Sequence, residues 1–280
     1  MILEVRNLRV EFPTRRGTLV AVDDVSFSIA PGEVLGVVGE SGAGKSLTGM
    51  AVINLLEPPG RIAAGEVRLE GRRIDDLPQD AMRRVRGREI GVVFQDPLTS
   101  LNPLYTVGEQ LVETITTHLP LSRSQARERA IELLREVGIP GAEARFAHYP
   151  HQFSGGMRQR VVIALAIAAE PKLIIADEPT TALDVSIQAQ IIALLKRLAQ
   201  TRGTAIMLVT HDMGVIAETS NRVAVMYAGR IAEIGPVRDV IHAPKHPYTV
   251  GLMGSIPKIA PSERGRRLVQ IEGSMPRLNA

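Results

Sequence analysis

The sequence predicts an α/β protein whose core is a mixed parallel sheet, with an N-terminal antiparallel β subdomain and an inserted α-helical subdomain. Three observations predict this fold class. Short apolar runs rich in β-branched residues recur along the chain, polar and apolar residues alternate near the N-terminus, and helix-compatible sequence fills about 97–165. Uninterrupted apolar strands are typical of sheets buried on both faces, whereas alternation is typical of strands with one face in water.

The composition restricts the function classes. The 280 residues are 45% apolar, which is enough for one large domain or for a domain with an appendage. The net charge is only +3, aromatic residues make up 3% and tryptophan is absent, so we expect no nucleic-acid partner. Because the chain has no cysteine, disulfides, zinc–cysteine clusters and thiol catalysis are excluded.

Neither a signal peptide nor a membrane span is expected. The N-terminus alternates like a strand, and the longest apolar run, 161–169, is too short to cross a bilayer. We therefore expect a soluble, cytoplasmic protein whose association with a membrane goes through a partner.

Strands of two kinds are expected in chain order. The alternating, antiparallel N-terminal stretches are 2–12, 21–39 and 65–74. The uninterrupted runs 34–38, 172–177 and 205–211 are expected to form buried parallel strands. Each of these runs ends at polar residues, where an open α/β sheet binds its ligands.

Helix signals occupy the regions between these strands. Ser122 and Gln125 have the spacing of a capping box, and Gly138 can end the helix that follows. An apolar face over 187–198 predicts another helix. Residues 222–235 predict a hairpin, and after His242 the chain is expected to be irregular because it contains several prolines.

Gly39 to Ser46, GESGAGKS, fit the pattern G-x-x-x-x-G-K-S. The motif follows the apolar strand 34–38 and precedes a helix-compatible run, which is the context of a P-loop, or Walker A motif. Lys45 is expected to neutralise the β- and γ-phosphates of a nucleotide and Ser46 to ligate Mg²⁺. The expected nucleotide-binding residues of this motif are Gly39, Glu40, Ser41, Gly42, Ala43, Gly44, Lys45, Ser46 and Leu47.

Four polar residues at strand ends are candidates for catalysis. Asp177 ends a buried strand, where its carboxylate can reach the Mg²⁺ shell, and the adjacent Glu178 suits a general base that polarises water. Gln95 can touch both Mg²⁺ and the water, and His211 can donate to the γ-phosphate. Acidic strand ends are structural as often as functional, and a loop amide or a lone histidine is structural more often. The P-loop nevertheless favours the functional interpretation.

A second anion-binding pattern lies far downstream. In FSGGMRQR, residues 153–160, a serine and two glycines precede a basic helix start. Five motifs then occur in order: GESGAGKS, FQD, FSGGMRQR, ADEPTTALD and THD. Over residues 1 to about 245 the chain resembles the nucleotide-binding subunit of an ABC transporter, an ATPase that uses ATP and Mg²⁺.

The resemblance implies a site shared between two subunits. In that family two cassettes pair head to tail, so it implies that the signature loop faces the nucleotide held by the P-loop of a second subunit. The residues implied at that partner nucleotide are Ser154, Gly155, Gly156, Met157 and Asp184. It also implies that Phe12 stacks on adenine, that Gln95 lies at a hinge, and that the inserted helices grip a permease.

The signature loop departs from the family consensus at two positions. Phe153 and Met157 replace the first and last residues of the consensus L-S-G-G-Q, and methionine cannot hydrogen-bond as glutamine does. Met157 at this place resembles the oligopeptide/dipeptide importer branch, including its nickel and glutathione relatives. The expected domains are a nucleotide-binding domain over 1–245 and a C-terminal extension over 246–280, short and without the cysteine cluster found in many members of the branch.

The resemblance implies an import ATPase on the cytoplasmic face of the membrane. Its partners would be a second ATPase subunit, two membrane permeases and, indirectly, an extracytoplasmic solute-binding protein. Di- or oligopeptides are the favoured solutes, while nickel, glutathione and the choice between a homodimer and a heterodimer stay open. The alternatives are a non-transport ABC ATPase acting on DNA or ribosomes, and a nucleotide-binding regulator with weak hydrolysis.

Overall fold

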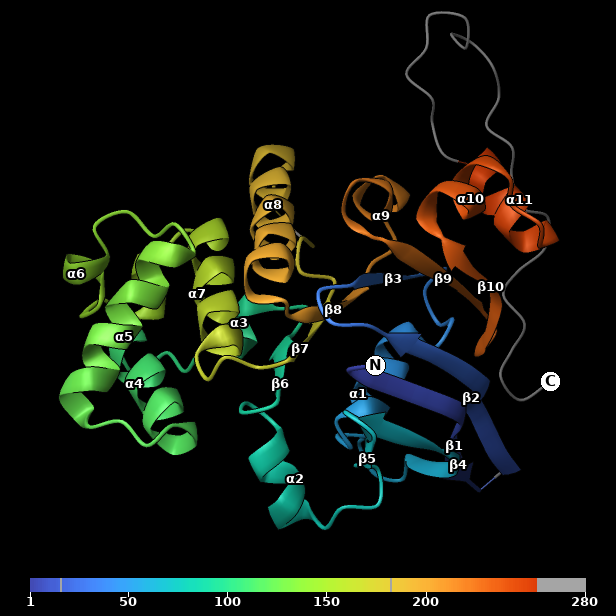
Figure 1. Cartoon of the computed structure of the whole chain (residues 1–280), viewed down its shortest axis with the longest axis horizontal. Helices are drawn as coiled ribbons and strands as arrows, with labels where there is room; N and C mark the ends of the chain where they lie inside the picture. Colours follow the sequence, from blue (N-terminus) through green and yellow to red (C-terminus); the bar gives the residue numbers. More distant parts are fainter. Residues whose placement is uncertain (16, 182, 256–280) are drawn as a thin grey trace, which may run out of the picture.

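The computed structural model describes residues 1–15, 17–181 and 183–255. The described strands form two sheets, and Figure 1 shows them near the centre and lower right of the view. One group of helices lies to the left of the larger sheet and a second group lies above its right end. The predicted α/β class with an antiparallel N-terminal part and inserted helices is confirmed.

The first sheet is antiparallel and has the strand order β2-β1-β4-β5. Its strands are β1 (Leu3–Thr14), β2 (Gly17–Ile29), β4 (Arg61–Leu69) and β5 (Arg72–Arg73). Alternation explains the start of β1, because Leu3 and Val5 are buried while Glu4 and Arg6 form an ion pair on the other face. A register shift between Val5 and Leu8 then places Val10 in the core as well. The alternating N-terminal pattern therefore predicted this sheet, although residues 34–38 at the end of the stretch 21–39 belong to the second sheet.

The second sheet has the strand order β10-β9-β3-β8-β7-β6. Its strands are β3 (Val34–Val38), β6 (Ile90–Val93), β7 (Leu173–Asp177), β8 (Ala205–Val209), β9 (Arg222–Tyr227) and β10 (Arg230–Pro236). Neighbours from β9 to β6 run parallel, and β10 returns antiparallel to β9 as the predicted hairpin. The carboxyl ends of β3, β6, β7 and β8 therefore meet at one edge of the sheet.

Two apolar cores explain why these strands are apolar throughout. Val38, Ala176 and Leu208 face the helices of one core. Leu35 and Ile175 face the other core, which lies between the two sheets and contains α1 (Lys45–Val52). Residues on both faces of β3, β7 and β8 are buried, as the uninterrupted runs predicted.

The inserted helices form the left-hand group of Figure 1. They are α3 (Pro97–Ser100), α4 (Val107–His118), α5 (Arg123–Glu136), α6 (Ala142–Arg145), the 3₁₀ turn Pro150–Gln152 and α7 (Gly155–Ile167). Ser122 and Gln125 form the predicted capping box at α5, and Thr106 and Glu109 form a second one at α4. Helices α4, α5 and α7 contact one another, and α7 also contacts β6.

The remaining helices lie around the larger sheet. They are α2 (Gln79–Val85), α8 (Val185–Arg202), α9 (Met213–Thr219), α10 (Val237–His242) and α11 (Pro247–Gly254). The expectation of an irregular chain after His242 was wrong, because α11 follows. Proline favours the first turn of a helix, and Pro247 occupies that turn while the His246 ring accepts a hydrogen bond from the Tyr248 N–H. Most of the expected extension, 256–280, lies outside the described residues.

Over the ranges that the structure describes, no helix is both long enough and apolar enough to cross a membrane.

Candidate functional site

Four strand ends bring the predicted phosphate loop and the polar strand-end residues together. A cavity of about 530 Å³ lies at the edge where β3, β6, β7 and β8 end. It is lined by Ser41, Gly42, Gly44, Lys45, Ser46, Leu47, Gln95, Glu178 and His211. Residues separated by up to 170 positions thus share one cavity because the parallel strands end side by side.

The loop after β3 has the backbone that a phosphate cradle requires. Gly44 adopts φ +97° and directly precedes α1, so the helix begins at Lys45 with its N–H groups facing the loop. A Cβ at Gly39 would lie 2.2 Å from the carbonyl oxygen of Met226, so no larger residue fits there. The loop is therefore packed closely against the end of β9.

Lys45 is a desolvated cation inside this loop. Its Nζ donates to the carbonyl oxygens of Gly39 and Glu40, each at 2.9 Å, and only 6% of the residue is exposed. Burial lowers the pKa of Lys45, although Glu178 and Asp177 act in the opposite direction. An anion in the cavity would restore favourable interactions to a charge that has lost much of its water.

Ser46, which lines the cavity, forms an oxygen pair with the buried Asp177. The Ser46 hydroxyl donates to Asp177 Oδ1 at 3.0 Å. Burial raises the pKa of Asp177, and the hydrogen bond from Ser46 opposes that shift. Gln95 lines the same cavity as Ser46 and also carries an amide oxygen, so the three side chains offer the hard oxygen donors that Mg²⁺ prefers.

Glu178 is held by polar neighbours from three segments. Its Oε2 accepts hydrogen bonds from Thr181 Oγ1 at 2.8 Å and Gln95 Nε2 at 3.2 Å, and its Oε1 lies 3.2 Å from His211 Nδ1. Burial acts to raise the pKa of Glu178, but the hydrogen bonds from Thr181 and His211 outweigh it and lower the pKa. The carboxylate is therefore ionised and oriented toward the cavity. Its backbone adopts φ +45°, which is uncommon for a residue with a side chain.

Thr181 was not among the site residues that the sequence predicted. It lies inside the quoted motif ADEPTTALD, but a threonine three residues after the glutamate has no signal of its own. The turn reveals the reason for its position, since the Thr181 N–H also donates to the Glu178 carbonyl oxygen at 3.1 Å. This turn brings the threonine hydroxyl back to the carboxylate.

Phe12 lies beside the phosphate loop but outside its cavity. It lines a neighbouring cavity of about 480 Å³ with apolar residues that include Met50 and Phe94. The two cavities have Ser46 and Leu47 in common. The Phe12 ring thus lies in a cavity that adjoins the phosphate-loop cavity, in apolar surroundings that suit a nucleobase.

The second anion-binding pattern is distant from the first within this chain. Ser154 caps α7, because its hydroxyl accepts a hydrogen bond from the Met157 N–H at 3.4 Å and the helix begins at Gly155. None of residues 154–157 lines the phosphate-loop cavity. Figure 1 shows α7 in the left-hand group of helices and α1 under the antiparallel sheet.

Asp184 lies close to this pattern and caps the neighbouring helix. It accepts from the Ile187 N–H at 3.0 Å at the start of α8. A Cβ at Gly156 would meet Ile187 Cγ2 at 2.6 Å, so the glycine allows the starts of α7 and α8 to pack together. The structure groups Asp184 with the serine–glycine loop and not with Lys45.

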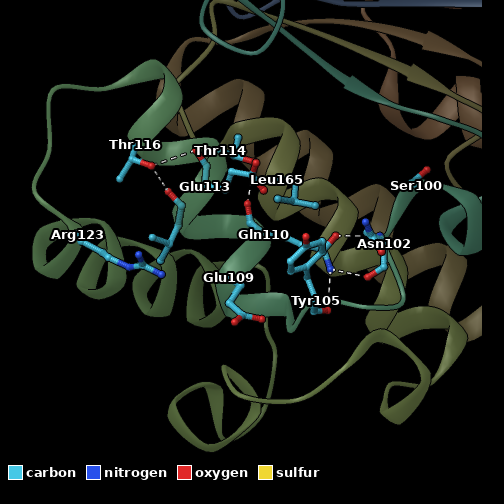
Figure 2. Close-up of a pocket in the computed structure, with 11 residues that line it drawn as sticks. Ser100, Asn102, Tyr105, Glu109, Gln110, Glu113, Thr114, Thr116, Arg123 and Leu165 are labelled. Atoms are coloured by element: carbon cyan, nitrogen blue, oxygen red, sulfur yellow. Dashed lines mark hydrogen bonds between the residues drawn. The ribbon is translucent and has the colours of Figure 1, made fainter.

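Another cavity lies in the inserted helices and contains none of the predicted site residues. Its volume is about 680 Å³, and α4 supplies much of its lining. Figure 2 shows Gln110 pointing toward the preceding loop, where its Nε2 donates to the carbonyl oxygens of Asn102 and Tyr105, each at 3.0 Å. The segment that follows Gln95 is therefore fixed onto α4.

Comparison with known families agrees with this arrangement. The model of the family described as ABC transporter matches residues 22–181, and that of the oligopeptide/dipeptide transporter C-terminal region matches 232–280. The chain therefore belongs to the ABC transporter family and is one of its ATP-binding subunits, an ATPase.

Individual relatives are similar to this chain over almost its whole length. The chain is 50% identical to the oligopeptide transport ATP-binding protein OppD of Bacillus subtilis, over 99% of this chain and 77% of the relative. It is 48% identical to OppD of Salmonella typhimurium and 47% identical to the dipeptide transport ATP-binding protein DppD of Bacillus subtilis, each over 99% of this chain and 82% of the relative.

Solved structures show the same fold. A dimeric ATP-binding cassette in a post-hydrolysis state, bound to ADP and Pi, is similar with a TM-score of 0.76 and 31% identity, covering 84% of this chain and 99% of that one. The cbiO1 protein of Clostridium perfringens, part of the ABC transporter complex cbiONQ, is similar with a TM-score of 0.73 and 28% identity, covering 86% of this chain and 91% of that one.

Proposed function

We propose that this ATPase is the energising subunit of an importer of di- or oligopeptides, on the cytoplasmic face of the membrane. The observation that carries the chemistry is the shared cavity of Lys45, Ser46, Gln95, Glu178 and His211. The names of the relatives support the peptide class, because OppD and DppD are described as oligopeptide and dipeptide transport proteins.

Binding of ATP would begin at the phosphate loop. Lys45 would donate to the β- and γ-phosphates from the position in which the loop carbonyls hold it, and N–H groups at the start of α1 would point at the same phosphates. Phe12 would stack on adenine from the neighbouring cavity. Ser46, Asp177 and Gln95 would hold Mg²⁺, which neutralises charge on the phosphates.

Hydrolysis would use Glu178 as the base. Its carboxylate is ionised and oriented by Thr181, so it can accept a proton from a water molecule that attacks the γ-phosphate. His211 and Gln95 hydrogen-bond the same carboxylate from either side of the cavity. His211 would donate to the γ-phosphate. The contacts of Gln95 would depend on whether the phosphate and the water are present.

A second cassette would complete each site. Ser154, Gly155, Gly156 and Met157 lie away from the phosphate loop of their own chain, so they would serve the nucleotide of a second subunit. The N–H groups at the start of α7 are suited to the γ-phosphate because they are free of helical partners. Asp184, at the adjoining start of α8, would link the two sites.

The inserted helices would contact the membrane partners, which we expect to be two permeases served by an extracytoplasmic solute-binding protein. Leu98, Leu104 and Tyr105, which follow Gln95, are 63%, 79% and 51% exposed. Several large exposed apolar residues in one short segment suit an interaction surface. Their connection to Gln95 along the chain would allow the state of the nucleotide to reach a permease.

Uptake of a labelled peptide tests the proposal. Cells of the native host whose own copy carries Lys45→Ala should lose uptake of di- or oligopeptides and keep uptake of free amino acids. The substitution removes the cation that meets the phosphates, so ATP can no longer drive transport. Unchanged peptide uptake would contradict the peptide assignment. Recovery of DNA-repair or ribosomal proteins with the tagged chain, without permeases, would contradict transport itself.

A further inference from the structure

A residue of the C-terminal region reaches the phosphate loop. The hydroxyl of Tyr248, in α11, accepts a hydrogen bond from the backbone N–H of Glu40 at 3.1 Å. Tyr248 is buried, with 6% of its surface exposed. It lies in the part of the chain that matches the oligopeptide/dipeptide transporter C-terminal region, outside the match to the ABC transporter model. The loop is therefore contacted by an element that the cassette itself does not supply.

The contact fixes one particular peptide group. The Glu40 N–H and the Gly39 carbonyl belong to the same peptide unit, and in a trans peptide they point in opposite directions. The N–H donates to Tyr248, while the carbonyl oxygen accepts from Lys45 Nζ at 2.9 Å. Tyr248 and Lys45 therefore hold this peptide from its two sides. A rotation of the peptide would break both hydrogen bonds at once.

Tyr248 is itself held firmly in place. The carboxylate of Glu233, in β10, accepts from the N–H groups of Lys245 and His246 at 3.0 Å, and this fixes the start of α11. The Tyr248 ring packs on Tyr227 with 4.5 Å between ring centroids. Burial also raises the pKa of Tyr248, so its hydroxyl keeps its proton at neutral pH.

The same end of the loop is supported by the β9–β10 hairpin, in which Tyr227 is the last residue of β9. The carbonyl oxygen of Met226 lies against Gly39, and the Gly229 N–H donates to the Ala43 carbonyl oxygen at 3.1 Å. These contacts come from the β9–β10 hairpin and fix both sides of Glu40. The Glu40 N–H itself depends on Tyr248 in the part of the chain that the structure describes.

We propose that Tyr248 is a positioning residue for the phosphates of ATP, acting through the Gly39–Glu40 peptide on Lys45. The inference rests on the proposed function of the loop and adds α11 to the nucleotide site. Tyr248 does not line the cavity, so it would not touch the nucleotide. Without its hydroxyl the peptide would rotate more freely, and Lys45 would spend less time in the position from which it meets the phosphates.

A pair of matched variants tests this role. Tyr248→Phe keeps the ring and removes the hydroxyl that contacts the loop. Tyr227→Phe is the control, because it removes the hydroxyl of the other ring in the pair. Among the described residues, the Tyr227 hydroxyl has no hydrogen bond to the loop. The dissociation constant for ATP should rise about two- to tenfold in Tyr248→Phe, the range expected for one hydrogen bond. It should equal the wild-type value in Tyr227→Phe, and kcat at saturating ATP should stay near wild type in both.

Three other outcomes would contradict the inference, and the measurements tell them apart. If Tyr248→Phe melts at a lower temperature but binds ATP like the wild type, the hydroxyl only stabilises the fold and the inference is overturned. Equal weakening by both variants would overturn it as well, because general packing of the ring pair would explain the effect. If the wild type itself fails to bind ATP, the proposed function fails, and the inference fails with it.

Discussion

At the scale of single residues, Glu178 combines a rare backbone conformation with a crowded polar environment. Its φ of +45° places the carboxylate at the end of β7, where Gln95, Thr181 and His211 all reach it. Strained backbone of this kind is found at functional sites because the surrounding contacts maintain it. Here the hydrogen bond between the Glu178 N–H and the Val209 carbonyl oxygen, at 2.8 Å, contributes to that restraint.

Glu178→Gln is expected to separate binding from hydrolysis. The amide keeps the shape of the side chain but cannot accept the proton, so hydrolysis should slow by about 10²–10⁴-fold while ATP binding persists. Single-turnover hydrolysis and equilibrium binding of ATP measure the two quantities. Glu218→Gln, at an exposed position of α9, is the control and should behave as the wild type. Turnover near the wild-type rate in Glu178→Gln would assign the base elsewhere.

The sequence predicted which residues share the phosphate-loop cavity better than it predicted the contacts between them. Lys45, Ser46, Gln95, Glu178 and His211 were all expected, because each follows an apolar strand and the strand ends converge. Thr181 and Tyr248 were not expected. Their hydroxyls act through a local turn and a tertiary contact, and neither produces a pattern along the chain.

At the scale of elements, the periodic and apolar segments were predicted well and the short ones were not. The strands β3, β7 and β8 could be recognised because burial on both faces requires an uninterrupted apolar run. Helix α11 was missed because the prolines in and around it suggest an irregular chain. In the structure, one proline occupies the first turn, where it fits a helix, and tertiary contacts of Tyr248 and Thr249 stabilise the rest.

The packing of α7 on β6 gives a prediction at this scale. A Cβ at Gly91, in β6, would lie 2.1 Å from the backbone carbonyl oxygen of Ala166, in α7, and backbone cannot move away cheaply. Gly91→Ala should therefore lower the free energy of unfolding by about 1–3 kcal/mol. Gly235→Ala is the matched control, because its Cβ meets only a methyl group of Val240, at 3.3 Å. Thermal melting compares the two, and equal melting temperatures would contradict the assigned contact.

At the scale of the whole molecule, the two loops that we propose as halves of a shared site do not meet within one chain. The phosphate loop lies at the carboxyl edge of the larger sheet, and the Ser154 loop caps α7 in the inserted helices. Both present helix N-termini with N–H groups suited to phosphate. A pair of chains arranged head to tail would join each loop to the other half, whereas a single chain leaves Ser154 without a nucleotide.

Complementation between two inactive variants tests this central claim most directly. Lys45→Ala disables the phosphate loop and Ser154→Arg disables the other half, so each variant alone should hydrolyse almost no ATP. Ser122→Arg, which removes the cap of α5 away from the site, is the control for loss of a helix cap and should remain active. In a mixed dimer both defects fall on one shared site and the second site is intact, so the account predicts that mixing restores ATPase activity. A mixture no more active than its separate components would contradict it.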